Sequence, residues 1–195
     1  MKKLEVRFTE LYIDHLHHLY SGEKQFAKTL VKMAKAATSK NLKQAFLDHA
    51  EETHEQIERL ITIFIEIARK PEGKKCVAMR GFIKEIEGVI KNANQFGPAV
   101  TDAALLAATQ CIKNYELCAY GTAKCFAELL GFGDAATLLG VTQEEETTID
   151  RKLNRLAKNE INPQALGSQD EEAEVEKVFG DAQHLKDQNG SVFHR

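Results

Sequence analysis

The sequence predicts an all-α protein, a four-helix bundle with an additional crossover helix between the second and the fourth helix. The chain of 195 residues has only three prolines, Pro71, Pro98 and Pro163, and each lies at a break between periodic segments. The long windows between them are rich in Ala, Leu, Glu, Lys and Ile, with little strand-like alternation. These residues favour helices, and their apolar members recur at helical spacing.

The first half of the chain reads as two long helices. The first is expected over residues 9–37, with Thr9 as its cap and Glu10 in its first turn, where an acidic side chain is favourable. The second is expected over residues 39–69 and ends before KPEGKK, a proline and glycine break.

A shorter helix over residues 75–92 is expected to connect the two halves of the bundle. Its apolar residues are spaced by three and four, as an amphipathic helix requires: Cys76, Met79, Ile83, Ile86 and Ile90. The turn NQFGP then leads to a long helix over residues 101–130, and the turn GFGDAA leads to a last helix over residues 135–158.

The chain is expected to divide into a helical bundle, residues 1–160, and a polar C-terminal segment, residues 161–195. From Gln164 onward the composition is that of a mobile tail, with one short helix around residues 171–178. One domain with a sizeable core and a tail suits this chain length.

Composition and charge point to a cytoplasmic protein with reduced thiols. The net charge of −3 gives no reason to expect a nucleic acid partner. No apolar run approaches the length of a membrane span, and charges within the first twenty residues exclude a signal-peptide core. Four cysteines do not make a disulfide scaffold.

Carboxylates interrupt the apolar faces of three predicted helices. With about 100° per residue, Glu23, Glu116 and Glu145 each lie at the centre of a stripe that should face the core. Glu146 lies at the edge of the stripe around Glu145. The predicted helices over residues 9–37, 101–130 and 135–158 therefore each present an inward carboxylate.

The second helix is less regular, but it also carries candidate ligands. Its His49 and Glu52 lie along one edge of the apolar face and, three residues apart, are able to converge on one site. A competing Glu-x-x-His pair, Glu51 and His54, is less suitable because Glu51 points well away from that face.

Buried carboxylates on several helices of one bundle require compensation. An isolated buried charge costs several kcal/mol or is neutralised by a shift in its pKa, and clustered carboxylates repel one another. A pair of divalent cations would remove both problems, as in di-iron carboxylate bundles. Alternatively, these glutamates pair with lysine or arginine, or lie at wet ends of the bundle.

Several motifs resemble the bacterial YciE/YciF ferritin-like stress proteins: LYSGEKQ, HAEETHEQIERLITIF, KKCVAM, DAALLAATQ, YELCAYGTA and LLGVTQEEETTID. The resemblance covers about residues 9–158. It implies a ferritin-like bundle, a cytoplasmic location, homodimers and a role in the stress response. It also implies metal ligands at the positions that match the acidic motifs: Glu23, His49, Glu52, Glu116 and Glu145.

The sequence departs from that family in two motifs. Relatives tend to have Met-Glu-Gly where this chain has Met79-Arg80-Gly81, and Glu-His-Tyr-Glu where it has Lys113-Asn114-Tyr115-Glu116. Lys113 lies roughly 60° from Glu116 on the helix. A lysine there is able to neutralise a carboxylate and to take the place of a metal.

Two functional hypotheses follow from these residues. In the first, iron (as a di-iron site) or manganese supports Fe(II) oxidation by O₂ or peroxide. Glu52 and Glu145 then bridge the metals, Glu23 and Glu116 are terminal ligands, and His49 is the nitrogen ligand. In the second, a non-enzymatic helical protein has kept the fold, lost the site and gained a salt-bridged core.

The cysteines in CIKNYELCAYGTAKC do not form a metal or disulfide site within their helix. Cys111, Cys118 and Cys125 are spaced by seven residues, about 10.5 Å along a helix axis. Neither a shared zinc ion nor a disulfide spans that distance. Burial at a close helix contact is the favoured interpretation, and an intermolecular thiol or dimer face is the alternative.

Overall fold

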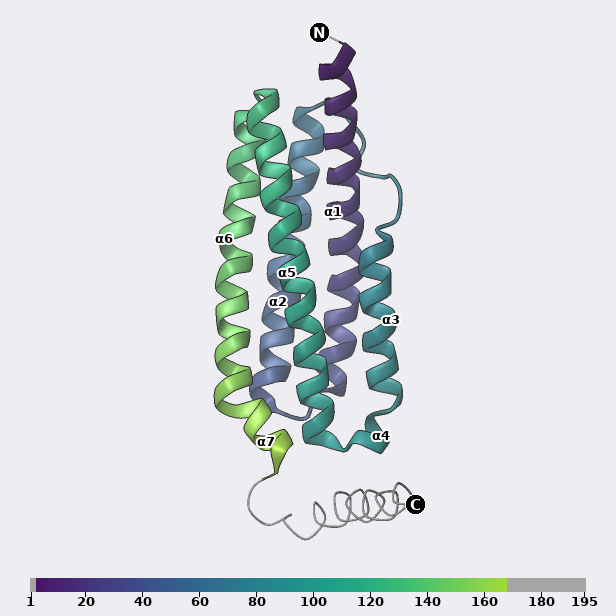
Figure 1. Ribbon diagram of the computed structural model, residues 1–195, viewed down its shortest axis with the longest axis vertical. Coiled ribbons are helices and arrows are strands. Elements are labelled where there is room, and N and C mark those ends of the chain that lie inside the picture. The colour runs from purple at the N-terminus through teal and green to yellow at the C-terminus, as the bar shows by residue number, and fades with distance from the viewer. Residues whose placement is uncertain (1–2, 168–195) are drawn as a thin grey trace, which may run out of the picture.

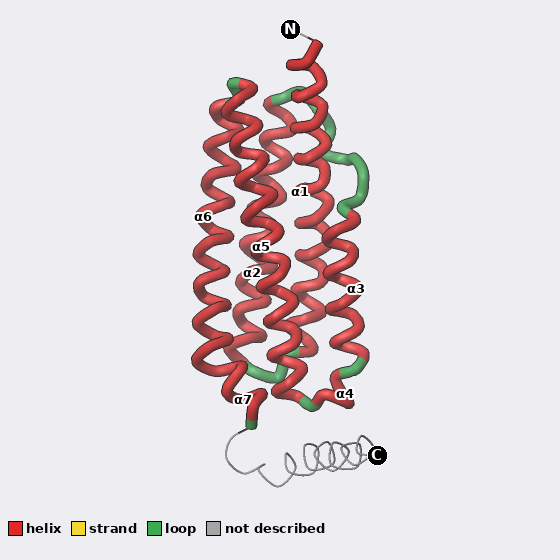
Figure 2. Tube along the Cα trace, in the orientation of Figure 1, coloured by secondary structure: helices red, strands yellow, loops and turns green. Residues whose placement is uncertain are grey.

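The structure, a computed structural model, describes residues 3–167 of the chain, and this part contains helices but no strands. Four long helices lie side by side along the long axis of the molecule (Figure 1): α1 (Lys3–Ala36), α2 (Lys40–Glu66), α5 (Pro98–Leu130) and α6 (Gly133–Leu156). Figure 2 shows that the connections gather mainly at the two ends of the bundle. The predicted all-α, ferritin-like four-helix bundle is confirmed.

The crossover helix is α3 (Val77–Lys91), which packs against α1 and α5 and is followed by the single turn α4 (Ala93–Phe96). The Cys76 side chain caps α3, because its Sγ accepts a hydrogen bond from the Met79 amide at 3.4 Å. Met79 and Ile86 are fully buried. The predicted connection between the two halves is therefore present.

The first two helices differ in how they begin. Ser39 caps α2, and its hydroxyl accepts a hydrogen bond from the Leu42 amide at 3.2 Å. The expected cap at Thr9 is wrong, because α1 already begins at Lys3. The Thr9 hydroxyl donates instead to the carbonyl of Glu5, one turn earlier in the same helix.

Helical structure continues beyond residue 160. A π-helical turn (Ala157–Ile161) and the short helix α7 (Asn162–Leu166) follow α6 directly. Ile161 is 1% exposed, so this extension contributes to the core. The expected mobile tail and its short helix around residues 171–178 fall largely outside the described residues, and the domain boundary at residue 160 stays a prediction.

The core consists of two apolar clusters with a polar layer between them. The first contains large side chains from all four bundle helices and α3, among them Phe26, Leu30, Met33, Phe46, Met79 and Leu105. The second lies toward the other end of the bundle and includes Tyr12, Leu16, Leu60, Phe64, Tyr120 and Leu139. Glu23 follows Leu19 and precedes Phe26 on α1, so it lies at the boundary between the two.

The expected burial of three cysteines is wrong. Cys111, Cys118 and Cys125 are all exposed, because α5 turns its opposite face, with Ile112 and Ala123, toward the core. Among the described helices, none has an apolar stretch long enough to cross a membrane.

Candidate functional site

The polar layer at the bundle centre combines side chains from all four long helices. Glu23 comes from α1, His49 from α2, Lys113 and Glu116 from α5, and Glu146 from α6. Each of these five residues is at most 2% exposed. Buried ionisable groups at this density need mutual compensation, since each alone would be strongly destabilising.

Lys113 lies at the centre of this cluster. Its Nζ donates to Nε2 of His49 at 2.6 Å, forms an ion pair with Oε2 of Glu116 at 2.5 Å, and donates to Oε2 of Glu146. The Phe26 ring lies below the ammonium, with its centroid 5.5 Å from Nζ. The ammonium therefore has three polar partners in the core, two through hydrogen bonds and one, Glu116, through an ion pair.

The contact with Lys113 determines which nitrogen of His49 carries its proton. An ammonium only donates, so Nε2 must offer the lone pair and the proton of the neutral ring lies on Nδ1. Burial, together with the charge of Lys113, lowers the pKa of His49 well below its ordinary value, which keeps the ring neutral. Neither nitrogen then has a free lone pair for a metal ion.

The pKa values of the Glu23 and Glu116 carboxyl groups are both raised, so each group has an increased tendency to hold its proton. Burial raises the pKa of Glu23 to about 8, and repulsion from Glu146 adds to this against the opposing effects of Lys113 and Tyr120. Burial likewise raises the pKa of Glu116 well above its ordinary value, although Lys113 acts against the shift. The raised pKa of both groups limits the negative charge that the cluster places around Lys113.

Lys113 itself keeps its charge. Burial alone would lower the pKa of this lysine, but the combined attraction of Glu116, Glu146 and Glu23 outweighs it, so its pKa lies above the ordinary value. The cluster thus holds a permanent cation at its centre.

Two further hydrogen bonds extend the cluster. Gln56, fully buried on α2, donates from Nε2 to Oε1 of Glu146 at 2.7 Å, and the Tyr120 hydroxyl donates to Oε1 of Glu23 at 2.8 Å. Several atoms of the cluster have no hydrogen-bond partner: Oε2 of Glu23, Oε1 of Gln56, Nδ1 of His49 and both carboxyl oxygens of Glu116, of which Oε2 forms the ion pair with Lys113.

The structure brings together three of the five residues that the sequence indicates as ligands, namely Glu23, His49 and Glu116. Glu145 is not among them. Its carboxylate forms a two-pronged pair with Arg59, at 2.5 and 2.6 Å, and its side chain is 33% exposed. Its neighbour Glu146, which is 0% exposed, enters the core instead, since adjacent helical residues differ by about 100° in direction.

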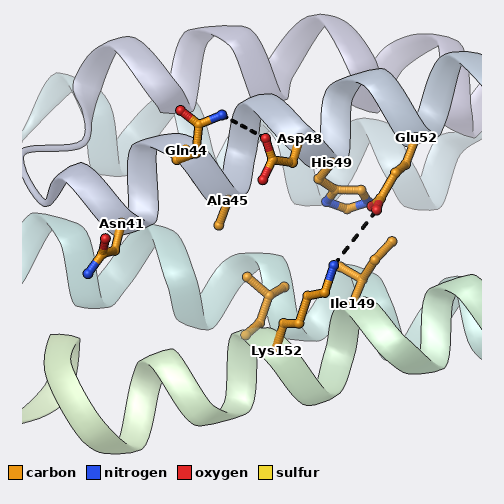
Figure 3. Close-up of a pocket in the computed structure, with 9 residues that line it drawn as sticks. Asn41, Gln44, Ala45, Asp48, His49, Glu52, Ile149 and Lys152 are labelled. Carbon is orange, nitrogen blue, oxygen red and sulfur yellow. Dashed lines mark hydrogen bonds and ion pairs between the residues drawn. The ribbon is translucent and has the colours of Figure 1, made fainter.

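Glu52 also lies outside the cluster. Its side chain is 38% exposed and reaches from α2 toward Lys152 of α6, with 4.0 Å between Oε1 and Nζ. Figure 3 shows this pair spanning a pocket of about 220 Å³ between the two helices, with the His49 ring in its wall. Glu52 is therefore a rim residue.

A shared cation is sterically possible at three residues of the cluster. One ligand atom each from His49, Glu116 and Glu146 lies within 4.8 Å of the others. The same three side chains, however, are the hydrogen-bond and ion-pair partners of Lys113.

The donor set does not fit a two-metal centre. Such centres in helical bundles take one glutamate from each of two helices and a Glu-x-x-His pair from each of the other two. Here the inward residue Gln56 of α2 is followed three positions later by Arg59, and Glu146 of α6 is followed by Ile149. One glutamate and two histidines of that pattern are thus replaced by other residue types.

Sequence reasoning did not include Glu146 or Gln56 in the cluster, although the pattern placed Glu146 at the edge of an apolar stripe. It noticed Lys113 beside Glu116 but did not place it at the centre. The sequence signal for the contact of Lys113 with Glu116 was their angular separation of roughly 60° on the same helix.

Comparison with known proteins places the chain in a family. Residues 7–166 match the family described as "Domain of unknown function (DUF892)". The chain is 43% identical over 166 residues to Protein YciF of Escherichia coli (strain K12), covering 85% of this chain and 96% of that protein.

Two solved structures resemble this one. The crystal structure of the E. coli stress protein YciF matches with a TM-score of 0.76 and 43% identity, covering 83% of this chain and 99% of that chain. YcfI of Rhodopseudomonas palustris matches with a TM-score of 0.71 and 37% identity, covering 75% of this chain and 92% of that chain.

The family match extends from α1 to the end of α7 and includes every residue of the polar cluster. The resemblance inferred from the sequence motifs is confirmed by relatives at this level of identity. The chain therefore belongs to the DUF892 family and is a homologue of the stress protein YciF.

Proposed function

We propose that this protein is a metal-independent helical stress protein that acts by binding or by its structure, and not by Fe(II) oxidation. The observation that carries the proposal is the Lys113 ammonium, which is partnered by His49, Glu116 and Glu146 in the bundle centre. The positive charge that the buried carboxylates need is thus supplied by a side chain of the protein and not by a bound metal ion.

Electrostatics support this proposal. A divalent ion bound by the same side chains would lie a few ångströms from a charged ammonium. At about 4 Å and an effective dielectric constant of about 20, a divalent ion and a unit charge repel by about 8 kcal/mol. Lys113 would have to leave the cluster or lose its proton, and it is fully buried.

The iron or manganese hypothesis draws its support from the compact group of His49, Glu116 and Glu146. It requires a lone pair on His49 that the Lys113 hydrogen bond already uses. Among the solved relatives, the R. palustris protein is described as a candidate structural protein, which agrees with a role without catalysis. A cytoplasmic homodimer remains our expectation for the assembly.

Metal loading of the full-length chain tests the proposal. The protein is incubated anaerobically with Fe(II) or Mn(II) and desalted, its metal content is measured, and O₂ uptake is then recorded. We expect no stoichiometric metal and no O₂ uptake above the protein-free rate. About two irons per chain, as in a di-iron bundle, with O₂ consumption would refute the proposal.

The variant Lys113→Glu tests whether the lysine is the reason. It removes the buried cation and adds a carboxylate to the donor set, so we expect it to retain more metal than the wild type. The control Lys40→Glu makes the same charge change at an exposed position at the start of α2 and should leave metal retention unchanged. Equal metal retention by both variants would mean that Lys113 is not the reason why the wild type excludes metal.

A further inference from the structure

A second pocket, which shares no residue with the polar cluster, lies between α1, the connection from α2 to α3, and the first turn of α3. Its volume is about 390 Å³. Four of the residues that line it are cationic and one is acidic: Lys24, Lys28, Lys75, Arg80 and Glu72.

The positive charge of this pocket is uncompensated. Its four cations and one carboxylate leave a formal excess of three positive charges in a chain whose net charge is −3. No ion pair of the described residues involves any of these four cations, whereas the neighbouring Lys32 and Lys74 pair with Glu87 and Asp14.

One of the four cations is held in place before any ligand binds. The Lys24 Nζ donates to the Tyr20 hydroxyl at 3.3 Å and lies 4.9 Å from the centroid of the same ring. Tyr20 is itself only 8% exposed and packs edge-on against Phe64. A positioned side chain loses less conformational entropy when it binds a ligand.

The wall of the pocket is also fixed to α1. The Ser21 hydroxyl accepts from the Cys76 amide at 3.0 Å, and Gln25 donates to the Cys76 carbonyl at 3.3 Å. Gly73 lies so close to His17 that a Cβ would be 2.5 Å from the Cγ of the ring. Only glycine at this position allows the connection to lie so close to α1. Because these contacts hold the connection against α1, the pocket is preformed.

We propose that this pocket binds a phosphate dianion, either free or as part of a small organic phosphate. Arg80 offers a planar pair of donors that suits phosphate oxygens, and the lysines supply point charges around it. Both Lys75 and Arg80 flank the start of α3 at Val77, where the helix dipole favours an anion. The volume suits a small ligand.

This inference is independent of the proposed function, because the pocket shares no residue with the Lys113 cluster. Its test is calorimetric titration of the full-length protein at low ionic strength with inorganic phosphate, adenosine monophosphate and, as an uncharged control, adenosine. We expect saturable binding of at least one phosphate compound at one site per chain, and none of adenosine.

The two phosphate compounds distinguish the source of the anion. Tighter binding of adenosine monophosphate assigns the site to an organic phosphate, and equal or tighter binding of inorganic phosphate assigns it to the free anion. Weak, unsaturable heats with both compounds would overturn the proposal.

Variants localise the binding. Arg80→Gln and Lys28→Gln should each weaken it about tenfold or more, since hydrogen bonds to charged groups are the stronger kind. The matched control Lys84→Gln lies one turn after Arg80 on α3 and outside the pocket, so it should retain wild-type affinity. Equal losses in Arg80→Gln and Lys84→Gln would overturn the proposal, with circular dichroism verifying that all variants are folded.

Discussion

The Nζ of Lys113 lies 2.6 Å from Nε2 of His49, and this contact joins α5 to α2 across the centre of the bundle. Because the ammonium donates, the imidazole is a neutral acceptor with its own proton on Nδ1. A single lysine thus determines the protonation of the histidine and at the same time balances the buried carboxylate charge.

Loss of Lys113 should destabilise the protein strongly. Removing one partner of a buried ion pair typically costs about 3–5 kcal/mol, because the other charge remains buried and unpaired. We expect Lys113→Ala to lower the free energy of unfolding in urea by about that amount. Lys152→Ala serves as the control, since its 66% exposed side chain lies 4.0 Å from Glu52 and exposed pairs contribute about 0–1 kcal/mol. Similar losses in both variants would contradict the central role of Lys113.

Glu23 should make the stability depend on pH. Its pKa rises from an ordinary value of 4.5 to about 8 in the folded protein, so between these values the folded state holds a proton that the unfolded state has released. The contribution of Glu23 to the free energy of unfolding is therefore largest below about pH 4.5. It decreases as the pH rises through 8, by at most about 1.4 kcal/mol per pH unit.

Glu23→Gln tests this dependence, because a neutral amide keeps an acceptor for the Tyr120 hydroxyl and does not titrate. The free energy of unfolding, measured by urea titration from pH 5 to pH 8, should fall less steeply in the variant than in the wild type. Parallel curves for the two proteins would mean that Glu23 does not titrate in this range.

Neighbouring glutamates of α6 should differ sharply in their effects. Glu146→Ala removes one of the two buried carboxyl partners of Lys113 and the hydrogen-bond acceptor of Gln56, and should cost about 3–5 kcal/mol in urea unfolding. Glu145→Ala breaks only a partly exposed pair with Arg59 and should cost about 1 kcal/mol or less. The reverse order would restore Glu145 as the core residue.

The helices were predictable from the sequence because their signals are local. Apolar spacing and the proline and glycine breaks act over a few residues and agree with one another. The start of α1 was missed for a related reason: Thr9 resembles a cap, but its hydroxyl is satisfied one turn back within a longer helix. Local chemistry does not determine where a terminal helix begins.

The candidate site was only partly predictable because it depends on contacts between helices. Helix periodicity identified Glu23 and Glu116 directly, but it favoured Glu145 over Glu146. The local pattern does not contain the direction in which α2 and α5 meet α6, and that direction places Glu146 in the core. Lys113 was harder still, since lysine is almost never fully buried unless it is paired. Its partners come from two other helices as well as its own.

Thiol reactivity should distinguish the two kinds of cysteine in this chain. Cys111, Cys118 and Cys125 are exposed on the outer face of α5. Cys76 is 2% exposed, caps α3 through its Sγ and contacts the Tyr115 hydroxyl at 3.2 Å. With an aromatic disulfide reagent, we expect three thiols to react rapidly in the folded protein and the fourth only after unfolding in urea.

The concentration dependence of that reaction carries further information. Three fast thiols at every protein concentration would agree with a free outer face of α5, and their protection at high concentration would mean that a second copy covers this face. The variant Cys76→Ser should leave the count of fast thiols at three, because it removes only the buried group. Fewer than three fast thiols in a dilute, monomeric sample would contradict the exposure of these residues and restore their expected role as packing groups at a helix contact.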